Sequence, residues 1–398
     1  MKGLGTQTNA APRLPLGLLA AAGFLSSLGA RIVDPLLAVL AEDFATTVAM
    51  AAVLITTFTI PYGCCQLVLG PLGDRFGKLR VLLGALCGYA LFMGGCAAAG
   101  DLGTLAVLRA CAGAASGGLI PTCLAYIGDA VPYEDRQVTL SRFLTGAVLA
   151  QALAGPLGGV FGEFLGWRFV FVLLSGTAVL VALALAVRLP GLADRRREGG
   201  GVALGNFALL ARYRPARLLL GVTLIEGALL PGAFPFVAPY LVERFGLSYL
   251  AVGLILSCIG PGALLYTRAA PVLLRLLGEP GLVLAGGLLI ALSLAVALEL
   301  GVWWAFVPVQ IALGLGYFML HSVMQTRATE LLPEARATAV SLFVFMLFLG
   351  QGLGALLMGV AIGLWGFRVA FHADIVGTLV LTLWLAAYMR RRHALDAR

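Results

Sequence analysis

Residues 149–160 read LAQALAGPLGGV, and residues 349–360 read LGQGLGALLMGV. The two runs share leucines, one glutamine, one glycine and one valine at matching positions, 200 residues apart. Each run lies inside an uncharged apolar stretch that is long enough to cross a membrane as a helix. The sequence therefore predicts a membrane-spanning helix that occurs twice in the chain.

The match between the two regions continues on both sides of these runs. Identical residues 200 positions apart include Glu134 and Glu334, Arg136 and Arg336, Gly166 and Gly366, and Arg168 and Arg368. Leucine and glycine coincide easily by chance in such stretches, but charged residues and glutamine do not. The chain is therefore predicted to consist of two parallel repeats, which is an architecture of membrane transporters.

The composition of the whole chain also indicates a membrane protein. Of its 398 residues, 61% are hydrophobic and only 12% are charged, whereas a soluble domain is about 45–50% apolar and about 25% charged. A soluble enzyme needs a more charged surface, and a disordered chain needs low hydrophobicity, so both classes are excluded. Long apolar runs exclude an outer-membrane barrel, whose segments alternate. The predicted fold is an all-α membrane protein with room for about twelve transmembrane helices.

We place these helices in two pseudo-symmetric bundles of six. The predicted spans cover residues 15–40, 48–70, 80–99, 103–128, 138–161, 168–188, 217–240, 249–267, 281–298, 303–326, 337–359 and 367–389. A polar stretch rich in arginine and glycine is predicted to be a linker between the bundles. The organisation is a tail (1–14), a first bundle (15–188), a cytoplasmic linker (189–216), a second bundle (217–389) and a second tail (390–398).

The basic residues predict the orientation of the chain in the membrane. With the N-terminus in the cytoplasm, only Arg168, Arg244 and Arg368 of the 27 lysines and arginines lie in outer loops, and Arg31 and Arg109 lie within spans. All the others fall in cytoplasmic segments, so the positive-inside rule places both termini there. The net charge of +8 thus reflects topology, and no basic patch interleaved with aromatics indicates a nucleic-acid partner.

The sequence carries no signal for a metal, a cofactor or an enzyme. Its seven cysteines lie in apolar runs, without partners at metal or disulfide spacing. It has no glycine loop ending in Lys-Ser or Lys-Thr, so ATP is not the expected energy source. It also lacks a nucleophile elbow, and its first apolar run is too long for a cleavable signal peptide. We expect a protein without a cofactor, driven by an ion gradient or by the gradient of its substrate.

A short loop after the second predicted span carries the first motif. It reads GPLGDRFGKLR over residues 70–80 and contains Gly70, Gly73, Asp74, Arg75, Gly77 and Lys78. Glycine permits a tight turn, and we expect Arg75 to pair with a carboxylate across the bundle. The loop resembles the signature loop between spans 2 and 3 of the major facilitator superfamily, which implies a conformational latch. The corresponding loop over residues 267–278 lacks the acid, so a stronger latch is expected in the first half.

The second motif places an arginine inside the fourth predicted span. Arg109 lies in the run LAVLRACAG over residues 105–113, which resembles the span-4 motif of the same family. That resemblance links Arg109 to proton coupling. An arginine in the bilayer is costly, so Arg109 should face a cavity or a partner. The alternative is that its side chain extends to the outer end of the span.

The third motif is rich in glycine and lies in the fifth predicted span. Gly155, Pro156, Gly158 and Gly159 resemble a motif of the drug:proton antiporter branch of the family, which implies export by antiport. Small residues allow spans 5 and 8 to pack closely, and Pro156 is expected to bend its helix. The second half has Leu356 at the position of Pro156, so the bend is expected in one half only.

Ionisable residues in the first span are candidates for function. Arg31 and Asp34 are three residues apart, which places both on one helix face. In one interpretation they neutralise each other. In the other, Asp34 carries a proton, or Arg31 binds an anionic group of the substrate. The sequence leaves these interpretations open.

Glu226 is the second acidic candidate, well inside the apolar run 218–230. Span 7 corresponds to span 1 in the repeat, so Glu226 and Asp34 are expected on opposite walls of a cavity. One acid would carry the proton and the other a cationic substrate. The alternative for Glu226 is a hydrogen bond to a neighbouring span. Asp374, in the last span, is expected to have a structural partner.

Polar aromatic residues complete the candidate site. Tyr126 in span 4 and Tyr317 and His321 in span 10 are expected to line the cavity, because spans 1, 4, 7 and 10 do so in the family that the chain resembles. His321 is either a packed hydrogen-bonding residue or a proton relay. Three prolines within residues 231–239 predict a broken helix at the outer end of span 7.

The resemblance implies a bacterial efflux permease of the major facilitator superfamily, similar to the twelve-span drug:proton antiporters. We expect proton-coupled export of a small organic compound (a drug, a sugar or a metabolite) by rocker-switch alternating access. One alternative is an importer or uniporter of a small organic anion that uses Arg31. Another is a lipid flippase or a sensor that transports nothing. We expect a monomer in the inner membrane, whose partners are its substrate, protons and the lipid bilayer.

Overall fold

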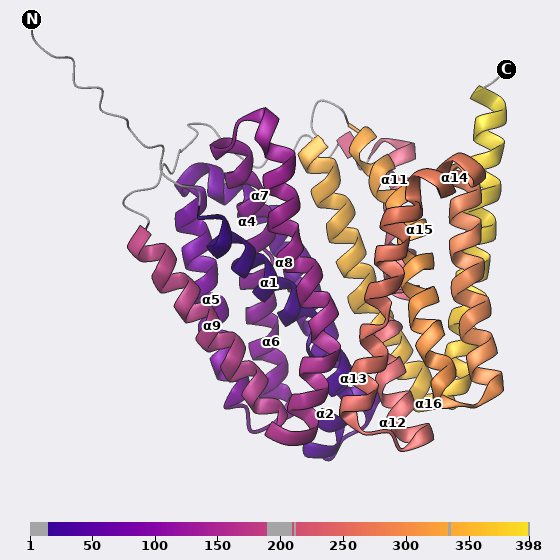
Figure 1. The fold of residues 1–398 in the computed structure, drawn as a ribbon, viewed down its shortest axis with the longest axis horizontal. Helices are drawn as coiled ribbons and strands as arrows, with labels where there is room; N and C mark the ends of the chain where they lie inside the picture. The colour runs from indigo at the N-terminus through magenta and orange to yellow at the C-terminus, as the bar shows by residue number, and fades with distance from the viewer. Residues whose placement is uncertain (1–14, 189–208, 211, 333–335, 397–398) are drawn as a thin grey trace, which may run out of the picture.

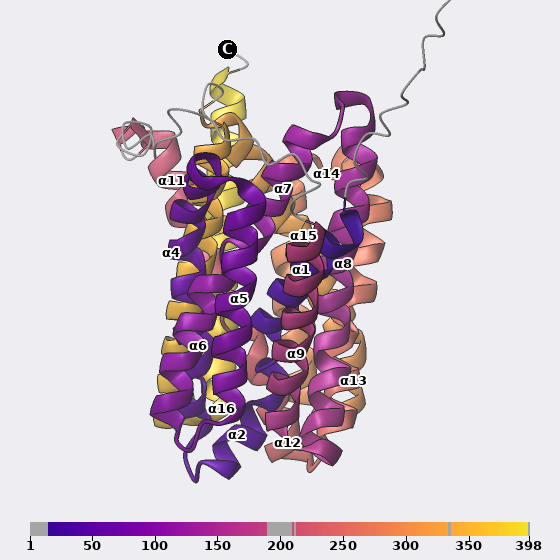
Figure 2. The ribbon, with the colours of Figure 1, turned by 90° about the vertical axis from the view of Figure 1, so that its left-hand side faces the viewer.

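In this computed structural model, the described residues form helices and no strands (Figures 1 and 2). The structure describes residues 15–188, 209–210, 212–332 and 336–396. The helices of the first half are α1 (Leu16–Arg31), η1 (Asp34–Leu36), α2 (Leu37–Asp43), α3 (Val48–Ala51), α4 (Val53–Phe76), α5 (Lys78–Ala97), α6 (Leu102–Ser116), α7 (Leu119–Ala130), α8 (Tyr133–Val160), η2 (Phe161–Leu165) and α9 (Trp167–Arg188). Those of the second half are α11 (Arg214–Leu229), η4 (Phe234–Phe236), α12 (Val237–Phe245), α13 (Tyr249–Ser257), α14 (Ile259–Leu300), η5 (Trp303–Ala305), α15 (Phe306–Glu330) and α16 (Arg336–Asp396).

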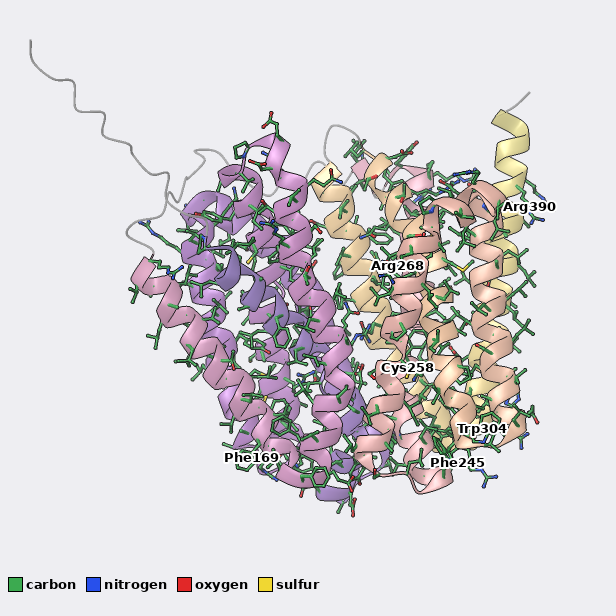
Figure 3. The ribbon with its side chains drawn as sticks, in the orientation of Figure 1. Phe169, Phe245, Cys258, Arg268, Trp304 and Arg390 are labelled. Atoms are coloured by element: carbon green, nitrogen blue, oxygen red, sulfur yellow. The ribbon has the colours of Figure 1, made fainter. Side chains whose placement is uncertain are left out.

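The helices form two bundles that lie side by side in Figure 1. In the N-terminal bundle, α1 packs against α8, and α5 packs against α6 and α9. In the C-terminal bundle, α14 packs against α15, and α11 packs against α16. We call the side where α16 ends the tail side and the side of α2 and α12 the far side. Figure 3 shows Arg390 at the tail side and Phe245 and Trp304 at the far side.

Ten segments of the described chain are long and apolar enough to cross a membrane. Two of them greatly exceed the roughly 20 residues that one crossing needs, because Tyr249–Leu300 has 52 residues and Thr338–Arg391 has 54. Each is interrupted by a glycine with a non-helical backbone, Gly278 (φ 62°) and Gly366 (φ 78°). These conformations favour glycine, since a side chain at positive φ is strained.

Breaks in the helices recur at matching places in the two halves. Gly166, 200 residues before Gly366, also has a positive φ, of 82°. Pro35 and Pro235, another pair at this offset, lie in the short turns η1 and η4. Because proline removes a backbone donor, each turn interrupts the helix that contains it. The broken helix predicted from the prolines of residues 231–239 is thus confirmed, whereas the equivalent break at η1 was not predicted.

Among the described residues, the main contacts between the bundles are those of α8 with α13 and of α4 with α16. In the first pair, a Cβ on Gly155 would overlap with the carbonyl oxygen of Gly253. Beside the second pair, α16 also packs against α3, where a Cβ on Gly359 would lie 3.1 Å from the carbonyl oxygen of Ala49. Glycine therefore allows the backbones of the two bundles to approach closely at both seams.

Polar contacts reinforce one of these seams on the far side. The hydroxyl of Tyr249, at the start of α13, donates to Glu42 Oε2 at 3.0 Å, and its backbone N–H donates to Glu163 Oε2 at 2.8 Å. Both carboxylates belong to the N-terminal bundle. We call Tyr249, Glu42 and Glu163 the far-side clamp, because together they hold the two bundles against each other on that side.

Candidate functional site

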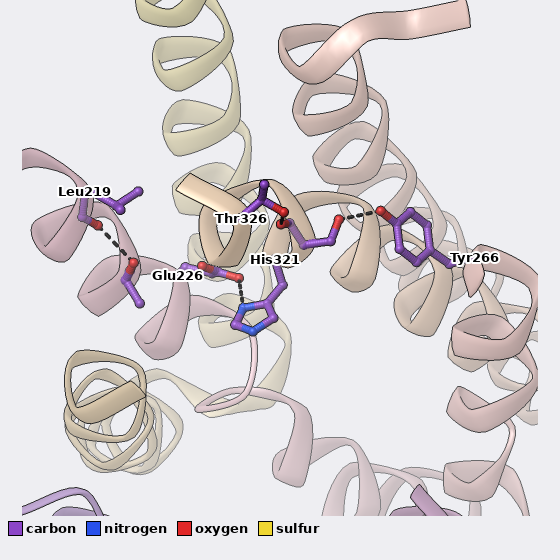
Figure 4. A network of polar contacts seen from close by, with 7 residues as sticks. Leu219, Glu226, Tyr266, His321 and Thr326 are labelled. Atoms are coloured by element: carbon purple, nitrogen blue, oxygen red, sulfur yellow. Dashed lines mark hydrogen bonds and ion pairs between the residues drawn. The ribbon is translucent and has the colours of Figure 1, made fainter. Parts of the chain in front are cut away.

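A buried ionisable pair lies between α11 and α15 of the C-terminal bundle (Figure 4). Glu226 is 0% exposed and His321 is 9% exposed. A hydrogen bond of 2.8 Å joins Glu226 Oε1 to His321 Nδ1. The other carboxylate oxygen, Oε2, is buried without a hydrogen-bond partner in the described part of the chain. Leaving a buried polar oxygen without a partner is costly, so this atom is a candidate contact for a water molecule or a polar group of a substrate.

Aromatic rings line one side of His321. Tyr317, one turn earlier on α15, stacks on the imidazole with ring centroids 5.1 Å apart and planes 14° apart. Phe343 of α16 lies 5.4 Å from the imidazole, and Phe234 of η4 lies 6.1 Å from Tyr317. We call Tyr317, Phe234 and Phe343 the aromatic wall. Such rings offer a large apolar contact area with a preferred geometry.

The N-terminal bundle holds a second ionisable pair where α1 is broken. Arg31 Nη1 lies 3.5 Å from Asp34 Oδ2, and the two side chains are 26% and 13% exposed. The structure thus brings the two residues together, as their spacing predicts. Asp34 Oδ1 is buried and has no hydrogen-bond partner among the described residues. At this separation and exposure, both charged groups can still interact with other ions or with a substrate.

Arg109 is buried inside the N-terminal bundle and does not extend toward an end of its span. Its side chain is 0% exposed. Its Nη1 donates to the carbonyl oxygen of Gly29 at 2.8 Å, and its guanidinium lies 4.1 Å over the ring of Phe58. The Nε and Nη2 atoms have no partner in the described chain. A cation held mainly by an aromatic face and one carbonyl is far from neutralised.

Sequence reasoning missed a cluster of hydroxyl groups in the N-terminal bundle. Ser116 Oγ donates to Ser26 Oγ at 3.0 Å, and Ser26 Oγ lies 3.3 Å from the hydroxyl of Tyr62. Ser26 is 200 residues before Glu226, so the repeat offset was the signal that could have found it. The first half therefore has neutral hydroxyls where the second half has an ionisable pair. Tyr126 of α7 is buried in the same bundle.

The loop motif forms a tight turn, but its ion pair differs from the prediction. Gly77, with φ 100°, separates α4 from α5, whereas Gly73 lies inside α4. Lys78 forms an ion pair with Asp129 at the end of α7. Arg75 is exposed and lies over the ring of Phe76. The expected pairing of Arg75 with a carboxylate across the bundle is therefore wrong within the described chain.

Two residues of this motif, Gly70 and Asp74, cannot be assigned contacts. The environment of Gly70 and the side chain of Asp74 lie outside what the structure describes. The geometry that the structure supplies for the motif is therefore the turn at Gly77 and the ion pair of Lys78.

The second half holds an equivalent ion pair with its charges reversed. Glu279, which follows Gly278, accepts hydrogen bonds from Arg327 Nη2 at 2.6 Å and Nε at 2.9 Å. Arg327 lies near the end of α15, as Asp129 lies near the end of α7. The expectation of a stronger latch in the first half overlooked this pair. Here the acid, Glu279, follows the glycine turn and the base, Arg327, lies near the end of the partner helix, whereas the first half has the base after the turn.

The glycine motif of the fifth span packs against two different neighbours. Gly155 and Gly159 face α13, where a Cβ would meet backbone atoms of Gly253 and Tyr249, respectively. Gly158 instead faces Pro35 of η1, within its own bundle. Pro156 lies inside α8. The predicted close packing of spans 5 and 8 is present, and it depends on alternate glycines of the motif.

Repeated helical bundles that enclose buried ionisable pairs are the construction of a secondary transporter. The chain matches the sequence profile of the Major Facilitator Superfamily over residues 19–298. It belongs to this family, and it is a transporter-family protein and not an enzyme.

Curated relatives include transporters of different stated roles. A chloramphenicol resistance protein of Streptomyces lividans is 26% identical, over 88% of this chain and 89% of the relative. A probable sugar efflux transporter of Helicobacter pylori is 26% identical over 64% of each chain. An uncharacterised MFS-type transporter of Bacillus subtilis is 25% identical over 58% of this chain, and the match spans only 57% of that relative.

Solved structures share the fold. A bacterial homologue of the human lysosomal transporter Spinster has a TM-score of 0.77 at 16% identity, covering 94% of this chain and 96% of that one. A D-xylose-proton symporter has a TM-score of 0.72 at 16% identity, covering 93% and 96%. These likenesses establish the fold of the family, which the sequence repeats predicted.

Proposed function

We propose that the protein is a proton-coupled exporter of a small organic compound that works by rocker-switch alternating access. The observation that carries the proposal is the pair of Glu226 and His321, buried beside the aromatic wall with one carboxylate oxygen unpartnered in the described chain. Ionisable groups inside a membrane are functional candidates by default. Asp34 and Arg109 give the N-terminal bundle a second ionisable cluster, so each bundle offers groups for proton coupling.

The proposal includes a topology. The chain crosses the membrane twelve times, with one crossing on each side of Gly278 and one on each side of Gly366. Both termini lie in the cytoplasm. So does the linker of residues 189–216, which joins the bundle of residues 15–188 to the bundle of residues 217–389. The protein is a monomer in a bacterial inner membrane. The tail side is then cytoplasmic, and the far-side clamp keeps the outer side closed.

The first compounds to test follow from the site and from the relatives. The aromatic wall suits a compound with an aromatic ring, and the names of two relatives point to chloramphenicol and to sugars. Arg31, whose side chain is 26% exposed, favours a second candidate function, the import or uniport of a small organic anion. A panel that contains all these classes separates the two functions.

The test is a proton-flux measurement on purified protein in liposomes that contain a pH-sensitive dye. We expect one class of compound to evoke proton movement with the wild-type protein. Glu226→Gln should abolish that movement and change the affinity for the compound by less than about threefold, because the variant keeps the shape of the side chain but cannot release a proton. Asp101→Asn is the control, since Asp101 is an exposed acid at the start of α6.

Two outcomes would contradict the proposal. Proton movement that survives in Glu226→Gln would remove the pair as the carrier and leave Asp34, tested as Asp34→Asn. Labelled compound that equilibrates without proton movement would establish a uniporter instead.

A further inference from the structure

A hollow of about 400 Å³ opens inside the C-terminal bundle on the tail side. Its inner end is lined by Leu219 and Val222 of α11 and Met324 of α15. Val222 is four residues before Glu226, and Met324 is three residues after His321, so each lies one helical turn from the pair on the same helix face. The hollow therefore reaches to within about one turn, about 5.4 Å along the helix, of the buried pair.

The mouth of the hollow is polar. Glu279 and Arg327, which form the ion pair described above, lie there with Glu330 and with the aromatic side chains of Tyr213 and Tyr388. Glu330 is exposed and forms no ion pair among the described residues. Charged and hydroxyl groups of this kind hold water in a space of this size, so the mouth is suited to water that exchanges with the surroundings.

The hollow ends in apolar side chains on the side toward the pair. Val222, Leu219 and Met324 are 3%, 6% and 1% exposed. Methionine has three rotatable bonds and adapts to local space, so a small movement of Met324 would open this apolar end to water. On the side of the pair, the unpartnered Oε2 of Glu226 is a group that a water molecule would satisfy.

We propose that this hollow is a proton passage between the pair of Glu226 and His321 and the tail side, separate from the proposed substrate site beside the aromatic wall. The proposal rests on the proposed function, because it requires that the pair carries the proton. The protonated pair gives its proton to a water molecule in the hollow, which passes it to bulk water at the mouth. The pair is left as a carboxylate and a neutral imidazole. A separate passage lets the proton leave while the substrate occupies the site beside the aromatic wall.

The test narrows the passage without touching the pair. Val222→Phe places a larger side chain at the inner end, so substrate-evoked proton release should slow by about tenfold or more, which corresponds to about 1.4 kcal/mol in the barrier. The affinity for the substrate should stay within about twofold. Val222→Ala should release protons at least as fast as the wild type. Leu124→Phe, on α7 of the other bundle and 200 residues before Met324, is the matched control and should have no effect.

Proton release from Val222→Phe at the wild-type rate would overturn the proposal. If Val222→Phe lost proton release and substrate binding to the same extent, the proposal would also be overturned, since the proton and the substrate would then share one route. Folding of each variant is checked by its elution volume in size-exclusion chromatography and by its melting temperature.

A labelling experiment tests the passage independently of transport. Met324→Cys is made in a background in which the seven native cysteines are replaced by serine. A small membrane-impermeant thiol reagent should modify this cysteine from the tail side, and bound substrate should not protect it. Val222→Phe should slow the modification. Absence of modification, or full protection by substrate, would refute the passage. If the wild type moves no protons with any compound, the proposed function fails, while this labelling still decides whether water enters the hollow.

Discussion

Arg109 is a buried arginine that donates a hydrogen bond to the carbonyl of Gly29 and lies over the ring of Phe58. Two of its nitrogen atoms have no partner among the described residues. Moving a guanidinium out of water costs several kcal/mol, and this set of contacts offsets only part of that cost. We therefore expect Arg109 to serve transport at the expense of stability.

Replacement of this residue should separate the two properties. Arg109→Leu removes a poorly compensated buried charge, so the free energy of unfolding should stay unchanged or rise by about 1–4 kcal/mol, while proton-coupled transport is lost. Arg109→Lys keeps the charge but loses the planar fork, and it should lose transport without gaining stability. Melting temperatures in detergent and proton flux in liposomes measure both effects. A fall of several degrees in the melting temperature of Arg109→Leu would show that the arginine is structural.

At the scale of single residues, the candidate functional residues were predictable from the sequence, but most of the contacts that they make were not. Glu226 and His321 stand out because ionisable side chains are rare in apolar runs. Their pairing was not predictable, because they are 95 residues apart and the relative rotation of α11 and α15 depends on packing throughout the bundle. Ser26 was missed because a serine in a span is common and carries no charge.

At the scale of helices, two ion pairs connect a residue directly after a glycine turn to the end of another helix. Lys78 and Asp129 join α5 to α7, and Glu279 and Arg327 join α14 to α15. Each pair begins directly after a glycine turn, so it fixes the helix as it leaves the turn. The side chain of Lys78 is 6% exposed and that of Asp129 is 36% exposed, so the pair is only partly screened by water.

The reversed order in the second half suggests a charge swap as the test of the first pair. Lys78→Glu places two acids together and should lower the free energy of unfolding by about 1–3 kcal/mol. Lys78→Glu combined with Asp129→Lys should recover most of that loss, because it recreates the order of Glu279 and Arg327. Denaturation of the single, double and wild-type proteins measures the coupling. A double variant as unstable as the single would mean that the pair contributes nothing as a pair.

Helix positions were the most predictable feature at this scale. The predicted span of residues 80–99 corresponds to α5, Lys78–Ala97, and that of residues 168–188 to α9, Trp167–Arg188. Long apolar runs determine such positions because a crossing needs a fixed length. The pairing of Lys78 in place of Arg75 was not predictable, since it depends on which direction the chain takes after Gly77.

At the scale of the whole molecule, the two seams between the bundles are related but not alike. Tyr249, held by Glu42 and Glu163, is 200 residues after Ala49, whose neighbours across the other seam are Gly359 and Gly363. The second seam thus packs small residues where the first has the far-side clamp. Opening the molecule has to break charge-assisted hydrogen bonds at one seam. At the other it breaks close packing and a neutral hydrogen bond of 2.7 Å from Thr56 Oγ1 to the carbonyl oxygen of Gly352.

Loss of the clamp should shift the balance between the two conformations. Tyr249→Phe removes the hydrogen bond to Glu42, which should cost the closed far side about 1–2 kcal/mol and change the population ratio about 5–30-fold. Spin labels on cysteines at Gly100 and Leu300, in the background without native cysteines, report the distance between the bundles on the far side. Asp101→Asn, which alters an acid away from the seam, should leave the distances unchanged. An unaltered distance distribution for Tyr249→Phe would exclude the clamp as a determinant of the conformation.

The repeat made the division into two bundles predictable, but not the conformation in which they meet. Glycines at both seams are readable from the sequence, and so is the match of Gly159 to Gly359. Which side is closed depends on a free-energy difference of a few kcal/mol between two packings of the same helices. That difference arises from contacts such as the one between Tyr249 and Glu42, which lie 207 residues apart.

The reversed ion pairs also bear on how two similar halves avoid confusion as the chain enters the membrane. If the helix that begins at Lys78 docked in the place of its repeat, it would bring Lys78 against Arg327, and the displaced Glu279 would meet Asp129. Both encounters oppose like charges, which disfavours the wrong partner. The reversal therefore favours docking of each helix in its own bundle. It disfavours docking in the other bundle, an error that two similar repeats make possible.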